Sequence, residues 1–370
     1  MAMINETPKI KVHKEDSTSL QNGEGGEVPI FIGATGKESP STEIYEFKNY
    51  KEASSETKGI GLPANNYMLP VLQDFFDETL KLVSDDIGVP HIYVKDLGNA
   101  TASTAAPWIN AKKDSRRKLD VQVEAYIFKS TDTLDKIVDV LVTIAESLKE
   151  DTLKGRPRIA YATVQGWTDA QMKTLTQGTE DITKKIRDID IGLIEWNKFG
   201  KHLARICLTP YYDEPGYYQF RSVKEGEFSE RTDAEEEDLQ LKGIIFGHDE
   251  KPGKTAFPKI NLAVSSDYAN EEDSRDQLCL LHTNRNVNQL IRDAMEVVYP
   301  QLKRRETETF IEEVQADLDD LCSEKIRQGY MKSGTRVTAV EYKDSPSQLK
   351  LKVKAAPVNI TGLIELDVIV

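Results

Sequence analysis

The most regular pattern of apolar and polar residues in this chain lies in its C-terminal region, residues 307–370. Apolar side chains recur there at intervals of three and four residues, which predicts an amphipathic helix over about Phe310–Arg327. Thr309 and Glu312 have the spacing of a capping box, in which a hydroxyl and a carboxylate satisfy backbone N–H groups at the start of a helix. One face of this helix is therefore expected to be buried.

The residues after this helix predict three strands. Two of them cover residues 335–342 and 349–355, and the third ends the chain with apolar residues in alternation. The apolar face of this last strand consists of Val358, Ile360, Ile364, Leu366, Val368 and Val370. A terminal strand needs partners for its backbone N–H and C=O groups, either inside the molecule or in another copy of the chain.

Between residues 28 and 208, short apolar segments alternate with amphipathic ones. The expected strands cover residues 28–33, 91–94, 121–128, 158–164 and 189–196. The expected helices begin at Asn65 or Asn66, at Leu134, at Thr168 and at Lys198. Thr168 and Gln171 repeat the capping-box pattern. Such alternation predicts a mainly parallel sheet, so the expected fold class is α/β (α+β), with a core sheet covered by helices.

Other stretches depart from this alternation. Residues 37–61 and the basic run 112–118 are expected to be loops. After residue 211 come clustered tyrosines and the acidic run 233–238, followed by a strand-like segment at 241–246. A further strand at 260–264 and a helix from Asn286 to about Tyr299 lead into the C-terminal region.

The chain has 62 Asp and Glu against 48 Lys and Arg in 370 residues, a net charge of −14. This balance argues against a nucleic-acid-binding surface as the main function, because nucleic acids are polyanions. Hydrophobic residues make up 39% and charged residues 30%, with a mean hydropathy of −0.49, which is typical of a soluble protein with much polar surface. No apolar run approaches the roughly 20 residues of a membrane span, and residues 1–20 lack the apolar segment of a secretory signal. Membrane insertion is therefore not expected.

Candidate chemistry is sparse. The three cysteines, Cys207, Cys279 and Cys322, are far apart, which favours buried thiols over a disulfide scaffold and fits synthesis in a reducing compartment. The five histidines do not fall at zinc-ligand spacing, and the sequence has no Gly-x-Ser-x-Gly motif. No catalytic, cofactor-binding or metal-binding residue is predicted, and the chain is not expected to be an enzyme.

Two segments come close to a phosphate-binding loop. Such a loop needs two glycines separated by four residues, then Lys and Ser or Thr, between a strand and a helix. Residues 247–255 have five residues between the glycines and precede a strand-like segment, and residues 33–37 lack the first glycine. Neither segment is expected to bind a nucleotide.

Residues 1–27 are polar and glycine-rich, apart from a short alternating segment that contains Ile10 and Val12. One interpretation is a disordered tail. The other is an arm that becomes a strand when it lies on the sheet of a neighbouring copy.

The C-terminal order of helix, Gly329, two strands, proline and final strand resembles the contractile tail sheath proteins of phage tails and R-type bacteriocins. Residues 26–33, Gly-Glu-Val-Pro-Ile-Phe-Ile-Gly, are similar to the Val-Pro-x-Phe-Ile-Gly strand that opens the core of those proteins. The middle of the chain matches them only in its α/β pattern.

The resemblance implies a structural subunit without a cofactor, which polymerises around an inner tube and contracts to drive the tube through a target cell envelope. It implies stacked hexameric rings of the chain itself, with the inner tail tube protein and the baseplate and tail terminator proteins as partners. The expected location is a virion tail or tail-like particle made in the host cytoplasm. Whether that particle is a phage, a bacteriocin or another injection system stays open.

The resemblance also implies extended N- and C-terminal arms that add strands to neighbouring subunits. The residues expected in these inter-subunit strands are Ile10, Val12, Val358, Ile360, Ile364, Leu366 and Val368. Lys303, Arg304 and Arg305 are candidates for contact with the tube, although cations at the end of a helix also complement its dipole. The expected divisions are an N-terminal arm (1–27), an N-terminal part of the sheath core (28–120), an α/β domain (121–285), a C-terminal sheath core domain (286–356) and a C-terminal arm strand (357–370).

A competing hypothesis is an α/β enzyme, or a protein that binds a nucleotide or small metabolite, with its ligand at the carboxyl ends of the strands. The alternation of strands and helices is compatible with this hypothesis. The absence of a glycine-rich loop of the right spacing counts against it.

Overall fold

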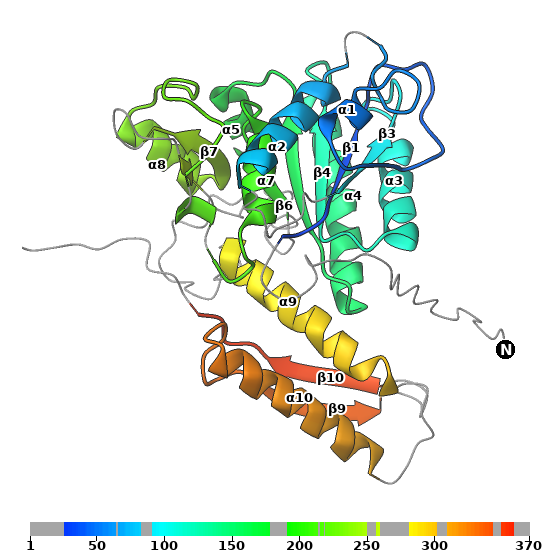
Figure 1. Ribbon diagram of the computed structural model, residues 1–370, viewed down its shortest axis with the longest axis vertical. Helices are drawn as coiled ribbons and strands as arrows, with labels where there is room; N and C mark the ends of the chain where they lie inside the picture. Colours follow the sequence, from blue (N-terminus) through cyan, green and yellow to red (C-terminus); the bar gives the residue numbers. More distant parts are fainter. Residues whose placement is uncertain are drawn as a thin grey trace, which may run out of the picture.

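The computed structural model describes residues 26–63, 66–82, 91–177, 191–213, 215–217, 219–249, 257–259, 281–301, 309–342 and 349–358. These residues form a sheet core, built around a large sheet, and a smaller C-terminal unit beneath it (Figure 1). The large sheet has eight strands among the described residues, in the order β2-β3-β1-β4-β5-β6-β7-β8.

The large sheet is mainly parallel, as the alternation of strands and helices predicts. Its strands are β1 (Pro29–Gly33), β2 (Tyr45–Phe47), β3 (Ile92–Asp96), β4 (Val123–Phe128), β5 (Ile159–Val164), β6 (Ile191–Ile194), β7 (Ile244–His248) and β8 (Phe257–Lys259). Six neighbouring strands run parallel to one another, in the order β3, β1, β4, β5, β6 and β7. The two edge strands, β2 and β8, are antiparallel to their neighbours. The predicted α/β fold class is confirmed.

Helices cover both faces of this sheet. They are α1 (Tyr50–Ala53), α2 (Met68–Leu82), α3 (Ala105–Lys118), α4 (Leu134–Leu153), α5 (Asp169–Gln177), α7 (Phe199–Leu208) and α8 (Asp233–Leu241). Helices α2 and α7 pack together in front of the sheet in Figure 1, and α3 packs against α4 behind it. Gly200 allows the close approach of α7 to α2, because a Cβ at this position would overlap the carbonyl oxygen of Val71.

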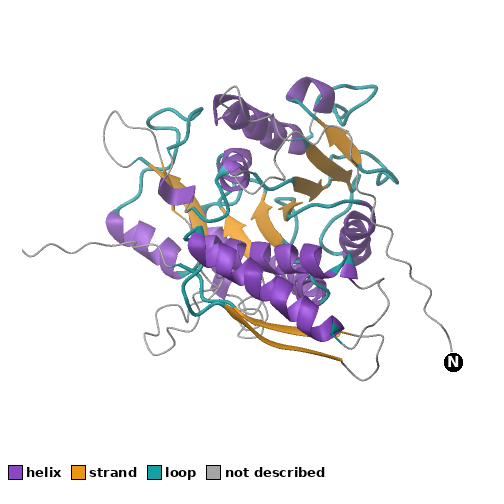
Figure 2. Ribbon diagram, turned by 60° about the horizontal axis from the view of Figure 1, so that its bottom comes forward, coloured by secondary structure: helices purple, strands orange, loops and turns teal. Residues whose placement is uncertain are grey.

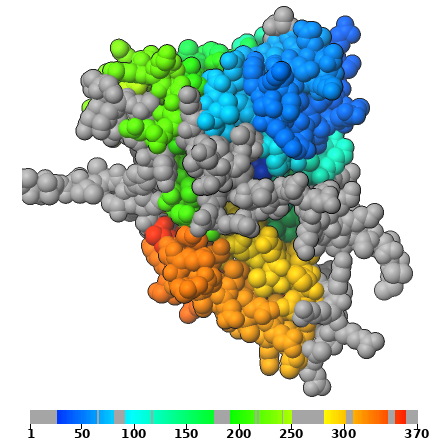
Figure 3. Space-filling model, in the orientation of Figure 1, coloured from blue at the N-terminus to red at the C-terminus, as the bar shows by residue number. Residues whose placement is uncertain are grey.

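The C-terminal unit consists of two helices and a two-stranded sheet. Its elements are α9 (Leu281–Val298), α10 (Phe310–Arg327), β9 (Arg336–Tyr342) and β10 (Leu349–Lys354). The antiparallel strands β9 and β10 lie beneath the two long helices in Figure 2, and the unit occupies one end of the molecule in Figure 3. It has an apolar core of its own, to which α9 contributes Ala294 and Val298.

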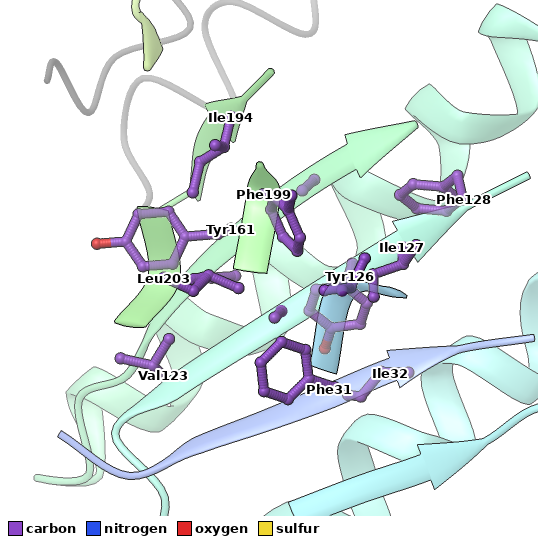
Figure 4. Packing of buried hydrophobic residues seen from close by; sticks show 14 of the residues in the cluster. Phe31, Ile32, Val123, Tyr126, Ile127, Phe128, Tyr161, Ile194, Phe199 and Leu203 are labelled. Atoms are coloured by element: carbon purple, nitrogen blue, oxygen red, sulfur yellow. The ribbon is translucent and has the colours of Figure 1, made fainter. Parts of the chain in front are cut away.

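The core of the large sheet lies on the central strands, which are covered on both sides. Every residue of β1, β4, β5 and β6 is buried, so these strands are nearly continuous apolar runs rather than alternating ones. Phe31, Tyr126, Tyr161 and Phe199 fill the space between strands and helices in Figure 4. Burial of each such aromatic side chain contributes about 2–3 kcal/mol, which makes this layer the main source of stability.

Most elements that the periodicity predicts are present. The capping box at α5 is confirmed, because the backbone N–H of Thr168 donates to Gln171 Oε1 at 2.9 Å and the N–H of Gln171 faces the Thr168 hydroxyl at 3.4 Å. The helix over Phe310–Arg327 is confirmed, but its predicted capping box is wrong. Thr309 has helical backbone angles, and its hydroxyl donates to Glu313 at 2.8 Å instead.

Two charged stretches form helices that the sequence did not predict. Residues 112–118, expected to be a loop, belong to α3. Pro107 lies in the first turn of this helix, where a missing N–H leaves no helical hydrogen bond unmade. The acidic residues 233–238 belong to α8, which a capping box between Thr232 and Glu235 initiates. The strand after α8 therefore begins at Ile244 rather than at residue 241.

Other predictions need smaller corrections. Residues 37–61 are not only a loop, since they contain β2 and α1, and the side chain of Asn49 caps α1. Helix α9 begins at Leu281 rather than at Asn286. The apolar pattern did not predict its first turns because most of the residues buried there are polar. The predicted strands at residues 260–264 and at the end of the chain lie outside the described residues.

Candidate functional site

The residues predicted to contact other molecules lie almost entirely outside the described part of the chain. Only Val358 is described, one residue beyond an isolated antiparallel bridge between Met331 and Pro357. The undescribed ones are Ile10, Val12, Ile360, Ile364, Leu366, Val368, Lys303, Arg304 and Arg305. Strand exchange and contact with a tube therefore remain predictions, as do the divisions of the chain into arms and domains.

At the carboxyl ends of β1 and β3, the loops that follow the two strands are held together by hydrogen bonds. The buried carboxylate of Asp96 accepts hydrogen bonds from the Thr35 hydroxyl at 2.7 Å and from the N–H of Gly98 at 2.8 Å. Lys37 lies 3.5 Å from the same carboxylate. The loop that resembled a phosphate-binding loop is thus folded onto Asp96, and its Thr and Lys serve to hold it there.

A second candidate lies at the carboxyl ends of β5 and β6, where a hollow of about 460 Å³ opens beside α5 and α8. Arg231 lies at its floor and donates to Asp169 at 2.7 and 3.1 Å, to Glu195 at 2.7 Å and to the carbonyl of Gly247 at 2.9 Å. These contacts tie the loop before α8 to β6 and β7. They also direct the donors of Arg231 at the protein rather than at the hollow.

Two titratable groups behind Arg231 could exchange protons, but both are buried. Burial raises the pKa of Glu195 to about 7, although Arg231 and the N–H of Gly247 both favour its ionised form. Burial also lowers the pKa of His202 to about 4, so its imidazole is neutral at pH 7. The His202 Nε2 and Glu195 Oε1 atoms are 3.6 Å apart, with side-chain exposures of 0% and 4%. Glu195 lines the hollow, whereas His202 is fully enclosed behind it.

The basic run 112–118 contains a residue with an unexpected position: Lys112 is buried inside the sheet core. Its Nζ lies 3.2 Å from both carboxylate oxygens of Glu124 and 3.2 Å from Asp151. Arg158 donates to Glu124 at 3.0 Å, and the Tyr126 hydroxyl donates to it at 2.7 Å. Burial alone would raise the pKa of Glu124, but Lys112 and Arg158 lower it below its ordinary value. This buried network joins α3, β4, α4 and Arg158, the residue just before β5.

The C-terminal unit is attached to the sheet core through Arg285 in the first half of α9. This fully buried guanidinium donates to Glu27 at 2.9 Å, to the carbonyl of Thr209 at 2.6 Å and to that of Pro210 at 3.4 Å. The backbone N–H of Glu27 in turn donates to the carbonyl of Cys207 at 2.7 Å. Arg285 therefore joins α9 to the end of α7 and to the residues just before β1.

A second attachment lies at the end of α10. The rings of Tyr212 and Tyr330 stack at 4.4 Å between centroids. Lys325 lies 2.5 Å from Asp293 and donates to the Tyr211 hydroxyl at 3.2 Å. The loop after α7 thus contacts both helices of the C-terminal unit.

The β9–β10 sheet has one apolar and one polar face. Val337, Val340, Leu349, Leu351 and Val353 pack toward α10, whereas Arg336 and the lysines of β10 are exposed. Among the described residues, no strand pairs with the outer edge of β9 or of β10. Backbone groups on these edges are suited to accept additional strands.

Neither a metal site nor a membrane span emerges from the described residues. They contain no group of three or more His, Cys, Asp or Glu side chains placed to hold a metal ion. None of their helices is both long and apolar enough to cross a membrane.

The fold is similar to chains of two large assemblies. One is a chain in the cryo-EM structure of the anti-feeding prophage (AFP) baseplate, with a TM-score of 0.63, 13% sequence identity and coverage of 98% of each chain. The other is a chain in the cryo-EM structure of the sheath complex of an extracellular contractile injection system, PVC, in its contracted state. That match has a TM-score of 0.60, 11% identity and coverage of 99% of this chain and 98% of the other. No protein-family model and no curated protein matches the sequence.

The buried charge contacts of Lys112 and Arg285 could not have been found from sequence periodicity. Lys112 and Arg285 lie in polar stretches, which favour solvent exposure. Their buried partners lie on other segments: Glu27 is 258 residues from Arg285, and Glu124 and Asp151 are 12 and 39 residues from Lys112. One available signal was the position of Glu124, a lone carboxylate within the apolar run of β4.

Proposed function

We propose that this chain is the sheath subunit of a contractile tail or tail-like injection particle, which polymerises around an inner tube and contracts to drive that tube through a target cell envelope. The observation that carries the proposal is the β9–β10 sheet, whose outer edges have no described partner strand. The similarity of fold to chains of the AFP baseplate and the PVC sheath, along nearly the whole chain, supports it.

In this proposal the open edges receive strands from neighbouring copies. The arm strands would contain Ile10 and Val12 at the N-terminus and residues 358–368 at the C-terminus, and their backbone hydrogen bonds would join subunits into stacked hexameric rings. Contraction is then a rigid-body rearrangement of subunits whose arms stay paired. Glu27, at the base of the N-terminal arm, is held by Arg285 on the helix that leads into the C-terminal unit, which supports a mechanical link between the two arms.

The subunit catalyses nothing in this proposal and needs no cofactor. The competing enzyme hypothesis loses support because the side chains of Thr35 and Lys37, in the segment that resembled a phosphate-binding loop, are engaged with Asp96. Partners are other copies of the chain, the inner tube protein and the baseplate and terminator proteins, with residues 303–305 at the tube. The particle is assembled in the host cytoplasm, without nucleic acid or membrane as a partner of the subunit.

The first test is electron microscopy and size-exclusion chromatography of the purified chain. Rings or long tubes are expected. A small compact oligomer whose melting temperature rises with a nucleotide or metabolite would favour the enzyme.

The second test addresses strand exchange directly. Deletion of residues 364–370 is expected to leave the melting temperature unchanged and to abolish tubes, because the lost strand pairs with a neighbour. Leu366→Pro should act in the same way by removing a backbone donor, whereas Leu366→Ala, which keeps the donor, should still assemble. A collapsed melting temperature, or normal tubes from the deletion variant, would contradict the shared strand.

A further inference from the structure

The exposed face of the β9–β10 sheet is basic in a protein that is strongly acidic overall. The two strands carry four cations, Arg336, Lys350, Lys352 and Lys354, against the single carboxylate Glu341. All four cations are exposed, since the apolar residues between them face α10. Glu341 lies 3.5 Å from Lys350 and 3.1 Å from Lys352, which leaves this basic face with a net charge of +3.

The outer side of α10 carries the opposite charge. The helix has six carboxylates, Glu312, Glu313, Asp317, Asp319, Asp320 and Glu324, against Lys325 and Arg327, a net charge of −4. Its buried residues Val314, Leu318 and Cys322 face the sheet, whereas Glu312, Glu313, Asp317 and Asp320 are exposed; Asp317 also accepts a hydrogen bond from the side chain of Gln301, just after α9. The C-terminal unit therefore has a basic sheet face and an acidic helix face on opposite sides, in the arrangement of helices over strands that Figure 2 shows.

We infer that the basic sheet face of one copy docks on the acidic α10 face of the next copy. This inference rests on the proposed function, because it names the partner surface within the same assembly. Consecutive lysines on one side of β10 lie about 7 Å apart. The carboxylates of Glu313, Asp317 and Asp320 follow one another along α10 at about 5–6 Å, a spacing that lets several cations meet several carboxylates.

Charge complementarity selects a second copy as the occupant, because the exposed carboxylates on α10 of one copy can pair with the cations on the basic sheet face of another. The two faces are also different surfaces of one unit, and contacts of this kind repeat head to tail into rings or helical filaments. Strands added at the sheet edges and a helix docked on the sheet face occupy different surfaces, so both contacts can form together.

The test is a charge exchange in the full chain. The sheet variant Lys350→Glu, Lys352→Glu, Lys354→Glu and the helix variant Glu313→Lys, Asp317→Lys, Asp320→Lys are each expected to weaken self-association at least about tenfold at low salt, because like charges then meet. A 1:1 mixture of the two variants should recover association, because each then finds an opposite face on the other. A control with the exposed lysines Lys51, Lys58 and Lys224 changed to glutamate carries the same charge change as the sheet variant and should associate like the parent.

Sedimentation measures the association, and carbodiimide cross-linking of mixed light and heavy isotope-labelled chains identifies the contact. Intermolecular links between the β10 lysines and the α10 carboxylates are expected. Unchanged association of the sheet variant, or no recovery in the mixture, would overturn the inference. Electron microscopy of the same samples separates the two proposals. If the sheet variant forms tubes, this contact is refuted and the sheath function stands. If the parent gives the expected cross-links but forms no rings or tubes, only the sheath function is refuted.

Discussion

Replacing Lys112 by methionine tests whether the buried charge network stabilises the sheet core. Methionine keeps most of the apolar stem of lysine, so the change removes a charge without leaving a large cavity. The side chain of Lys112 is 2% exposed. Its Nζ, which the substitution removes, lies 3.2 Å from Glu124 and from Asp151. Glu124 keeps Arg158 and Tyr126 as partners in this variant. However, the buried carboxylates of Glu124 and Asp151 both lose the cation that lay between them.

The expected loss is about 3–5 kcal/mol of unfolding free energy, the usual effect of removing one partner from a buried ion pair. Such a loss is a large fraction of the 5–15 kcal/mol that typically stabilises a protein, and it should lower the melting temperature by roughly 5 °C. Lys113→Met is the matched control, because Lys113 follows on the same helix and is exposed. Its effect should stay within about 0.5 kcal/mol.

The pH dependence distinguishes a charge effect from a packing effect. Glu124 normally has a lowered pKa, so its contribution to stability is present above pH 4.5 and is lost as the pH falls through its folded pKa. Without Lys112 that pKa rises, and the destabilisation of Lys112→Met relative to the parent should shrink between pH 7 and pH 4. Urea unfolding followed by circular dichroism at both pH values measures it. A melting temperature within 2 °C of the Lys113→Met control, or a deficit that does not depend on pH, would refute the network as a source of stability.

Three further changes have defined outcomes. Gly200→Ala should cost about 1–3 kcal/mol in urea unfolding, because its Cβ would overlap the backbone of α2; an unchanged midpoint would contradict the close contact. Burial lowers the pKa of His202 from 6.5 to about 4, so this group should remove about 3 kcal/mol of unfolding free energy as the pH falls from 6.5 to 4. The stability gap between the parent and His202→Gln should therefore narrow by that amount at acid pH, and an equal gap at pH 7 and pH 4 would argue against it. Reversal of residues 303–305 to glutamate should weaken co-assembly with the tube protein at an unchanged melting temperature, and normal co-assembly would exclude them from the tube contact.

Sequence periodicity predicted two kinds of element: helices that bury one apolar face, and strands that are apolar on both faces. Helices α2, α4 and α10 were predicted in this way because their apolar residues return every three or four positions. The central strands were found because their apolar runs are short and bounded by polar turns. These signals depend only on local order along the chain.

The elements that were missed bury charge or are short. Helix α3 contains a buried lysine in a basic run, and that run was interpreted as exposed because charged side chains are seldom buried without a partner. The partners of Lys112 come from β4 and α4, which only the folded chain brings together. Helix α8 could have been found, since Thr232 and Glu235 have capping-box spacing ahead of an acidic first turn.

The position of buried charge also bears on how a sheath subunit would transmit force. Strands shared with neighbours would pull on the β9–β10 sheet, so the unit that carries it must keep a fixed orientation to the sheet core. Apolar contacts alone are non-directional, whereas the planar guanidinium of Arg285 fixes α9 against the carbonyls of Thr209 and Pro210 through directed hydrogen bonds. The same side chain holds Glu27, two residues before β1 begins. In a sheath subunit, a load on the C-terminal sheet would thus pass through Arg285 on α9 to Glu27 and from there to β1 in the large sheet.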